Sequence, residues 1–562
     1  MPRAGRAALI ALPLFFLGLF FYYPLAGLVM RGLTGPAGVS LSQLTRIFSD
    51  GYLRHVLLFT VEQALLSTLA SVILGFFLAY LLTAYDFPGK RLLRSLLIVP
   101  FALPAITVAL GFILVFGNSG ILNRWLMTLF HVQSPPLPIL YSLQGILLAH
   151  AFYNAPIVAR FVAAAWERIA PDYEESARAL GAPRWRVFSD ITLPMLMPAL
   201  ISGATIVFIY CFLSFPIVLT LGGARFSTIE VEIYRRAIIQ IDSNGAAALA
   251  TVELLIALLF TMSYLRAERY YARHLRLTTH RPTRPLFTGL SSLARPSHWL
   301  IYAFLALSAL LFIGPIAAVV VDSFTRTWQN QTIFTLDWYR AILQPSYSAL
   351  IASSPLQSVG NSLSFAGVTM GLALTLGTIL SVALARRRFA GRGWIETLAM
   401  APIAISGVAW GLALLWAFVR PPLALSGTWG AIVIAHTALA IPFVIRAIRP
   451  ELERLEVHLV EAARSLGASR ARATRDIVLP LIRGGLLNAA VFAFAISIAE
   501  TSATIMLAQP GLLTMPVAVY YLLASRQFGA ASAMSVLLIA VITLSFVLVD
   551  RLGERTLRGG KV

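Results

Sequence analysis

The chain has 562 residues, of which 58% are hydrophobic and only 12% charged, and its mean hydropathy is +0.80. So much apolar surface beside so few charges excludes a soluble globular protein, and we expect an all-α integral membrane protein. The formal net charge of +20 does not indicate a nucleic-acid partner, because the arginines that carry nearly all of it lie unevenly in alternate loops. The single cysteine, Cys211, excludes an intrachain disulfide and a cysteine-rich metal cluster.

Twelve apolar stretches are long enough to cross a bilayer as helices, which takes about 20 residues. The first follows Arg3 and Arg6 and has no small-residue cleavage pattern, so we expect a retained span rather than an export signal. The approximate extents of the twelve predicted spans are 7–30, 56–83, 94–116, 140–165, 195–221, 246–265, 298–321, 361–385, 395–419, 428–448, 484–507 and 528–549.

Basic residues gather in every second loop. They are dense after the second, fourth and sixth spans, and again after the eighth, tenth and twelfth. The intervening loops hold few, such as Arg420 and Arg526. Because cytoplasmic loops of membrane proteins carry the excess of Lys and Arg, this bias predicts that both termini lie in the cytoplasm.

The chain repeats itself once. At an offset of 286 residues Pro156 matches Pro442 and Glu167 matches Glu453, and at an offset of 302 Gly89 matches Gly391. The 16-residue difference places a longer external loop in the first half. Six spans per half give two parallel repeats, with a pathway expected at their interface. We predict halves at 1–280 and 297–562, joined by a basic, proline-bearing cytoplasmic linker at 281–296.

One cytoplasmic loop in each half carries the same pattern. "EESARALGAPRWRVFSDITLP" occupies 174–194, within the loop 167–194, and "VEAARSLGASRARATRDIVLP" occupies 460–480, within the loop 453–480. Each glycine is followed, after nine residues, by Ile-x-Leu-Pro. The pattern predicts a short helix with small residues, a left-handed turn at Gly181 and Gly467, and a new helix that enters the membrane near the proline. The alternative is a pair of amphipathic loops lying on the membrane surface.

These residues resemble the EAA motif of type I ABC importer permeases, and the doubled arrangement resembles the fused permeases of the ferric-iron and thiamine importer family, thiamine permeases in particular. The resemblance implies the ABC transmembrane type-1 fold and cytoplasmic helices that dock onto ATPase subunits. It implies that the ATPase contacts are Glu175, Ser176, Ala177 and Gly181 in the first half, and Glu461, Ala462, Ala463 and Gly467 in the second. Ser176 stands where the motif prefers alanine, but a small residue is kept.

The resemblance also implies partners and a location. These are two copies of an ABC ATPase, an extracytoplasmic solute-binding protein and the lipid bilayer of a bacterial plasma (inner) membrane, with thiamine or ferric iron as cargo. ATP and Mg²⁺ would be used by the ATPase and no cofactor would be bound by this chain. The residues agree, because the two Gly-Lys pairs, at Gly89 and Gly560, lack the Ser or Thr of a phosphate-binding loop, so we expect a non-catalytic subunit.

Two further positions are candidates for the solute pathway. Glu500 is an ionisable residue toward the outer end of the eleventh span, and its counterpart in the first half is Ser214. Charges inside a membrane generally face a cavity or a partner, and the alternative is a position close to the outer interface, where ionisation costs little. His150 and His436 also match, and we expect packed, hydrogen-bonded rings rather than metal or substrate ligands. By resemblance alone, the outer segments around Gly222, Gly223 and Glu230, and around Thr514 and Tyr520, are expected to dock the binding protein.

An alternative architecture has the same count of spans. Major-facilitator secondary transporters also consist of two parallel six-span repeats, and they need no ATPase. Their loop between the second and third spans carries a Gly-x-x-x-Asp-Arg-like signature that "AYDFPGKRLL" does not supply. This alternative would also leave the two matching loops after the fourth and tenth spans without a role.

Overall fold

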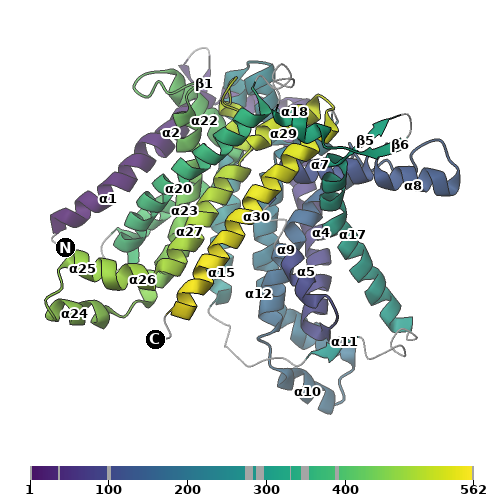
Figure 1. Cartoon of the computed structure of the whole chain (residues 1–562), viewed down its shortest axis with the longest axis horizontal. Helices are drawn as coiled ribbons and strands as arrows, with labels where there is room; N and C mark the ends of the chain where they lie inside the picture. The colour runs from purple at the N-terminus through teal and green to yellow at the C-terminus, as the bar shows by residue number, and fades with distance from the viewer. Residues whose placement is uncertain are drawn as a thin grey trace. The chain divides into compact units, whose positions relative to one another are not determined.

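The structure is a computed structural model of the whole chain, and it describes residues 3–35, 38–97, 103–223, 225–272, 283–286, 296–328, 331–343, 353–385 and 391–559 (Figure 1). The described residues form two compact units. The first-half unit comprises residues 44–235 and 252–322, and the second-half unit comprises residues 1–43, 236–251 and 323–562. Most of the predicted linker, 281–296, lies outside the described residues.

Helices dominate the first-half unit. Its helices are α4 (Gly51–Ala84), α5 (Lys90–Leu96), α7 (Ala105–Phe116), α8 (Ile121–Phe130), α9 (Leu143–Trp166), α10 (Pro171–Ala179), α11 (Arg184–Val187), the π-helix η2 (Phe188–Thr192), α12 (Leu193–Phe212), α13 (Pro216–Leu221), α14 (Ile229–Tyr234) and α17 (Pro296–Ser323). Strands β3 (Tyr85–Asp86) and β4 (Arg284–Pro285) pair in parallel, with Tyr85 opposite Arg284.

The second-half unit is also helical. Its helices are α1 (Arg3–Leu17), the π-helix η1 (Gly18–Tyr22), α2 (Tyr23–Gly32), α18 (Asp337–Leu343), α20 (Pro355–Ala385), α21 (Arg392–Met400), the 3-10 helix η5 (Ala401–Ala404), α22 (Gly407–Val419), α23 (Trp429–Arg454), α24 (Val457–Ser465), α25 (Arg470–Ala473), the π-helix η6 (Thr474–Val478), α26 (Leu479–Leu481), α27 (Arg483–Ala499), α28 (Ser502–Leu507), α29 (Met515–Ala524) and α30 (Phe528–Gly559). Two antiparallel strand pairs join β1 (Thr34–Gly35) to β2 (Gly38–Val39) and β5 (Thr325–Trp328) to β6 (Gln331–Phe334). Helices α3 (Ser42–Ser49) and α15 (Ser243–Ala272) and the π-helix η3 (Arg235–Ile239) cross the boundaries between the units, and the last residue of α17, Ser323, belongs to the second-half unit.

The helices confirm the predicted membrane-spanning architecture. Among the described residues, ten helices are long and apolar enough to cross a membrane, or twelve if each of two bent pairs is one span. Every predicted span overlaps one of them, although the third begins at Ala105 rather than near residue 94. The bent pairs are Arg392–Ala404 with Gly407–Val419, at 104°, and Ala471–Leu481 with Arg483–Ala499, at 70°.

The compact units cut across the predicted halves 1–280 and 297–562, because the first span of each half packs in the other unit. In the second-half unit, α1 and α2 lie beside α20 and α22 (Figure 1). The Phe21 ring contacts the Trp410 ring at a centroid distance of 4.9 Å, and the Tyr22 hydroxyl donates to the Leu398 carbonyl at 2.8 Å. In the first-half unit, α17 places Phe312 5.6 Å from Phe152, ring to ring.

A glycine lets two spans cross closely in each unit. On α4, a Cβ at Gly75 would lie 2.6 Å from the Ala155 carbonyl oxygen of α9. At the matching crossing of α20 with α23, a Cβ at Gly377 would lie 2.5 Å from Val444 Cγ1. Because lipid tails are as apolar as the helices themselves, spans associate mainly through close packing, which small residues permit. The sequence repeat is therefore also a repeat of packing.

Candidate functional site

Each predicted motif loop folds as a short helix closed by the same turn. After α10, Gly181 N–H donates to the Arg178 carbonyl at 2.9 Å and Ala182 N–H donates to the Ala177 carbonyl at 3.0 Å. After α24, Gly467 and Ala468 repeat both bonds, at 3.1 and 3.0 Å. This pair of bonds defines the Schellman motif, which needs a left-handed residue just past the helix end. The φ angles of +86° at Gly181 and +90° at Gly467 confirm the predicted turns.

The two turns expose the same apolar side chain. Leu180 and Leu466, which immediately precede the glycines, are each 89% exposed. Seven residues earlier, Tyr173 and Leu459 are also exposed, and this spacing places them on the same helix face as the leucines. Isolated exposed leucines are ordinary, but the same leucine exposed at the tip of both copies defines a repeated apolar surface.

The other residues predicted from the motif lie around this apolar surface. Glu175, Ser176 and Gly181 are exposed, as are their counterparts Glu461, Ala462 and Gly467, whereas Ala177 and Ala463 are half-buried. The loop therefore presents a charged side chain, small side chains and the leucine together. In each unit the short helix lies at one end of the long helices that it connects (Figure 1).

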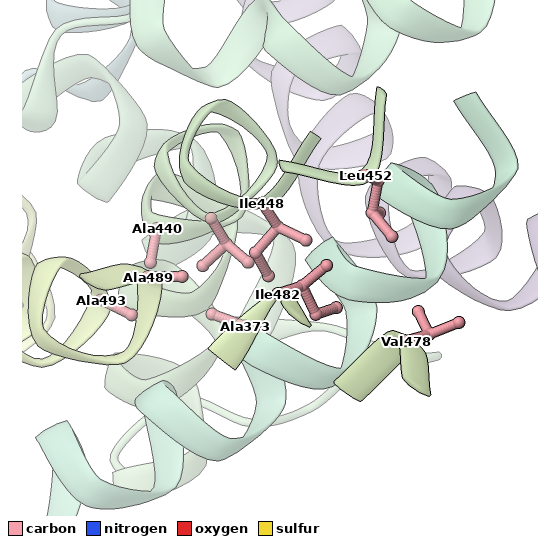
Figure 2. Packing of buried hydrophobic residues seen from close by; sticks show 9 residues of the cluster. Ala373, Ala440, Ile448, Leu452, Val478, Ile482, Ala489 and Ala493 are labelled. Carbon is pink, nitrogen blue, oxygen red and sulfur yellow. The ribbon is translucent and has the colours of Figure 1, made fainter. Parts of the chain in front are cut away.

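The short helices are attached to the following span by different chemistry. In the first half, the buried Glu174 carboxylate of α10 accepts a hydrogen bond from Thr192 Oγ1 at 2.9 Å. At the matching positions in the second half, Val460 packs against the cluster that contains the buried Val478. Figure 2 shows that cluster, in which Val478 and Ile482 lie near Ile448 and Leu452 of α23. The hydrogen bond ties α10 to the span that follows it, and the cluster ties α24 to the following span and also to α23.

A second attachment lies at the end of the span before each loop. Glu167, just past α9, accepts from Arg94 of α5 at 3.0 Å. Its counterpart Glu453, on α23, accepts from Arg392 of α21 at 3.2 Å and from Arg449 at 2.8 Å. Exposed ion pairs contribute at most about 1 kcal/mol each, so they orient these chain segments more than they stabilise them.

The span that follows each loop is interrupted before the end that lies away from the loop. Residues 213–215 separate α12 from α13, and Glu500 and Thr501 separate α27 from α28. Ser214 and Glu500, the two predicted pathway residues, therefore both lie at a helix break. Breaks at corresponding positions of two repeats are typical of substrate sites in membrane transporters.

Each break is held by the matching histidine. In the first-half unit, His150 Nδ1 lies 2.8 Å from Ser67 Oγ and Nε2 lies 2.8 Å from Ser214 Oγ. The ring is buried, and both nitrogens are within hydrogen-bonding distance of hydroxyl groups. The expectation of a packed, hydrogen-bonded ring is confirmed.

His436 has different partners in the second-half unit. Its Nδ1 lies 2.7 Å from Ser497 Oγ and its Nε2 lies 2.8 Å from Thr504 Oγ1, so the ring bridges the two sides of the break. Glu500 lies 3.6 Å from the same ring, and its carboxylate accepts from the backbone N–H groups of Ala503 and Thr504 at 2.9 Å each. Glu500 thus caps the first turn of α28.

The segments expected to dock a binding protein differ in exposure. Glu230 and Thr514 are buried, Gly222 is buried, and Tyr520 is half-buried. Gly223, at a φ of +62°, combines partial exposure with a backbone conformation that favours glycine. Among the described residues, no group of three or more His, Cys, Asp or Glu side chains could hold a metal ion.

Comparison with known proteins decides the family. A model of the family described as "binding-protein-dependent transport system inner membrane component" matches residues 71–277 and 373–558, so one match covers each motif loop. The chain belongs to this family. It is a multi-pass permease of a binding-protein-dependent transport system, and the major-facilitator alternative is set aside.

Relatives of the permease are named for different solutes. A thiamine transport system permease protein of Brucella suis is 30% identical over 548 residues, which are 95% of this chain and 93% of the relative. A ferric transport system permease protein of Actinobacillus pleuropneumoniae is 27% identical over 542 residues, which are 96% of this chain and 76% of the relative. A protein of Salmonella typhimurium, provisionally named for 2-aminoethylphosphonate transport, is 31% identical over 262 residues, which are 46% of this chain and 92% of the relative.

Sequence reasoning missed several residues of this site. Glu174 and Leu180 lie within the quoted loop pattern but were not among its predicted contact residues, and the partners of the histidines come from other spans. One signal was available for Leu180, because Leu466 occupies the same position at the offset of 286. No local pattern distinguishes Ser67 or Ser497 from other small polar residues of apolar helices.

Proposed function

We propose that the permease forms the solute pathway of an ABC importer and couples it to two separate ATPase subunits, one at α10 and one at α24. The observation that supports this is the pair of matching helices, each closed by a Schellman turn and tipped by an 89% exposed leucine. Two equivalent surfaces fit two equivalent partners. Glu175, Ser176, Ala177 and Gly181, with Glu461, Ala462, Ala463 and Gly467, would surround the leucines in the two contacts.

In this proposal the chain converts ATPase motion into movement of its spans. In one unit the short helix is tied to the following span by Glu174 and Thr192, and in the other it is tied to the spans on both sides by the Val478 cluster. A displacement of the helix therefore moves those spans. Hydrolysis of ATP with Mg²⁺ takes place in the partner, and this chain is a non-catalytic subunit that binds no cofactor.

The proposed orientation has both termini in the cytoplasm. Arginine-rich loops and the two motif loops then face the ATPases, as the positive-inside bias favours. Ser214 and Glu500 at the helix breaks belong to the solute pathway, and cargo arrives from an extracytoplasmic binding protein. Two relatives that span nearly the whole chain are named for thiamine and ferric transport, and these are the two candidate cargoes.

The coupling surface can be tested by substitution of exposed residues that leave the fold intact. The double variant Leu180→Ser with Leu466→Ser removes both apolar tips, and burial of a leucine side chain contributes about 1.5–3 kcal/mol. We expect at least a tenfold weaker association with the ATPase, measured by binding of the purified ATPase to the permease in nanodiscs. Leu41→Ser, at another exposed leucine outside the motif loops, is the matched control and should bind as the wild type does.

The leucine variant can contradict the proposed coupling surface, and a second double variant tests the same surface. ATPase association that remains normal in the double serine variant would contradict the proposed coupling surface. Gly181→Asp with Gly467→Asp, which strains both left-handed turns, should likewise leave membrane insertion intact and abolish ATPase association.

A further inference from the structure

A cavity opens beside the helix break of the first-half unit. Its volume is about 220 Å³, which is smaller than the roughly 300–1,000 Å³ of sites for drug-sized ligands, so it suits a small solute. The described residues that line it include the following polar and aromatic side chains from α9, α12 and the break: His150, Tyr153, Asn154, Tyr210, Ser214 and Phe215.

The polar groups of this cavity are held in place by neighbours. Ser214 is fixed by His150, as described above, and the Tyr153 hydroxyl donates to the Leu103 carbonyl at 2.7 Å. Asn154 Nδ2 donates to the sulfur of Cys211 at 3.3 Å. A small number of positioned polar groups among apolar and aromatic walls is the usual composition of a small-molecule site.

The aromatic walls occur in one half only. At the offset of 286, the counterparts of Tyr153, Tyr210 and Phe215 are Leu439, Ile496 and Thr501. Duplication alone would have kept the same residue types at both breaks. The three aromatic rings are therefore a chemical difference between the first helix break and the second.

The charge of the lining separates the solutes for which the relatives are named. No carboxylate, lysine or arginine is among the described lining residues. A bare ferric ion would need charged oxygen ligands, but the Tyr153 phenol proton is committed to Leu103 and both His150 nitrogens lie against hydroxyls. A phosphonate would need cationic donors. A flat heteroaromatic ring needs aromatic faces and neutral hydrogen-bonding groups, and these are present.

We propose that this cavity is a cargo site for a flat heteroaromatic organic solute, with the ring against Tyr153, Tyr210 and Phe215 and its polar substituents toward Asn154 and Ser214. The assignment rests on the proposed solute pathway and names the class of its cargo. It places recognition at the first helix break, whereas Glu500 at the second break serves as a helix cap.

Equilibrium binding to the purified chain in nanodiscs tests the site, with radiolabelled thiamine as the heteroaromatic probe. We expect saturable binding to the wild type and at least a tenfold loss of affinity in Tyr210→Ala, because this half-exposed ring is a wall of the cavity. Ile496→Ala, at the matching position of the second half, is the control and should retain the wild-type affinity. Ferric citrate and 2-aminoethylphosphonate should not compete.

The outcomes are separable from those of the coupling test. Absence of saturable thiamine binding to the wild type would overturn the inference, as would equal affinity in Tyr210→Ala or competition by ferric citrate or the phosphonate. Each of these results leaves ATPase association untouched, so the coupling proposal would stand. Loss of affinity in Tyr210→Ala alone, with ATPase association normal in both variants, supports the site.

Discussion

Gly377 shows how one residue fixes the distance between two spans. A Cβ at this position would lie 2.5 Å from Val444 Cγ1 of α23, closer than side-chain atoms approach one another. We expect Gly377→Ala to destabilise the permease by about 1–3 kcal/mol, the usual cost of an overpacked core. The measurement is the midpoint of thermal unfolding in detergent.

The control lies on the same helix. Gly371, also on α20, is exposed, and a Cβ at this position would meet no neighbouring helix within 4 Å. Gly371→Ala should therefore be neutral or raise stability by up to about 1 kcal/mol. Equal effects of the two alanines would show that the crossing at Gly377 is not close packed.

The two histidines show which properties of a residue the sequence predicts and which it does not. His150 and His436 match in the repeat, and both could be predicted to be packed because they lie in apolar helices. Their partners could not be predicted, since Ser67 comes from α4 in one case and Ser497 from α27 in the other. Repeats constrain which residues correspond, whereas hydrogen bonds depend on which helices meet.

At the scale of elements, the attachment of α10 to η2 offers a direct test of equivalence between the halves. Thr192→Val alone removes the hydrogen bond that the buried Glu174 carboxylate accepts from Thr192 Oγ1, while the ion pair of Glu174 with Arg178, at 3.4 Å, stays, and we expect it to destabilise the loop. Glu174→Val with Thr192→Val recreates the apolar contact of the second half. We expect the double variant to recover stability, with a coupling energy of about 1 kcal/mol or more in the double-mutant cycle.

The cycle needs two measurements, thermal unfolding and ATPase-dependent transport. Both are made on the wild type, the two single variants and the double variant. Strictly additive losses would mean that Glu174 and Thr192 do not act as a pair. The second half already contains the apolar version, so recovery would also show that either chemistry can hold the short helix.

Helix ends were predictable to different degrees. The turns at Gly181 and Gly467 could be predicted, because a left-handed residue after a short helix strongly favours glycine. The breaks at 213–215 and at Glu500 and Thr501 could not, because apolar residues continue on both sides and hydropathy reports burial in lipid rather than helix continuity.

At the scale of the whole molecule, the count of spans and their repeat follow from hydropathy and spacing, but the membership of the compact units does not. Residues 1–43 belong with the second half, and residues 252–322 belong with the first. Lipid-facing and protein-facing helices have similar composition, so apolar length alone cannot tell which neighbour a span packs against. That choice depends on contacts such as those of Phe21 with Trp410.

Because α1 and α2 pack in the second-half unit, we can predict how the chain behaves when it is divided between its halves. A fragment of residues 297–562 lacks α1 and α2, so Trp410, which is fully buried in the intact protein, loses the Phe21 ring that contacts it. We expect this fragment alone to accumulate poorly in membranes, and co-expression with residues 1–280 to restore it as a complex. Co-purification of the two fragments through a tag on one of them is the measurement. A fragment 297–562 that accumulates and unfolds identically with and without its partner would show that the first span contributes nothing to the second-half unit.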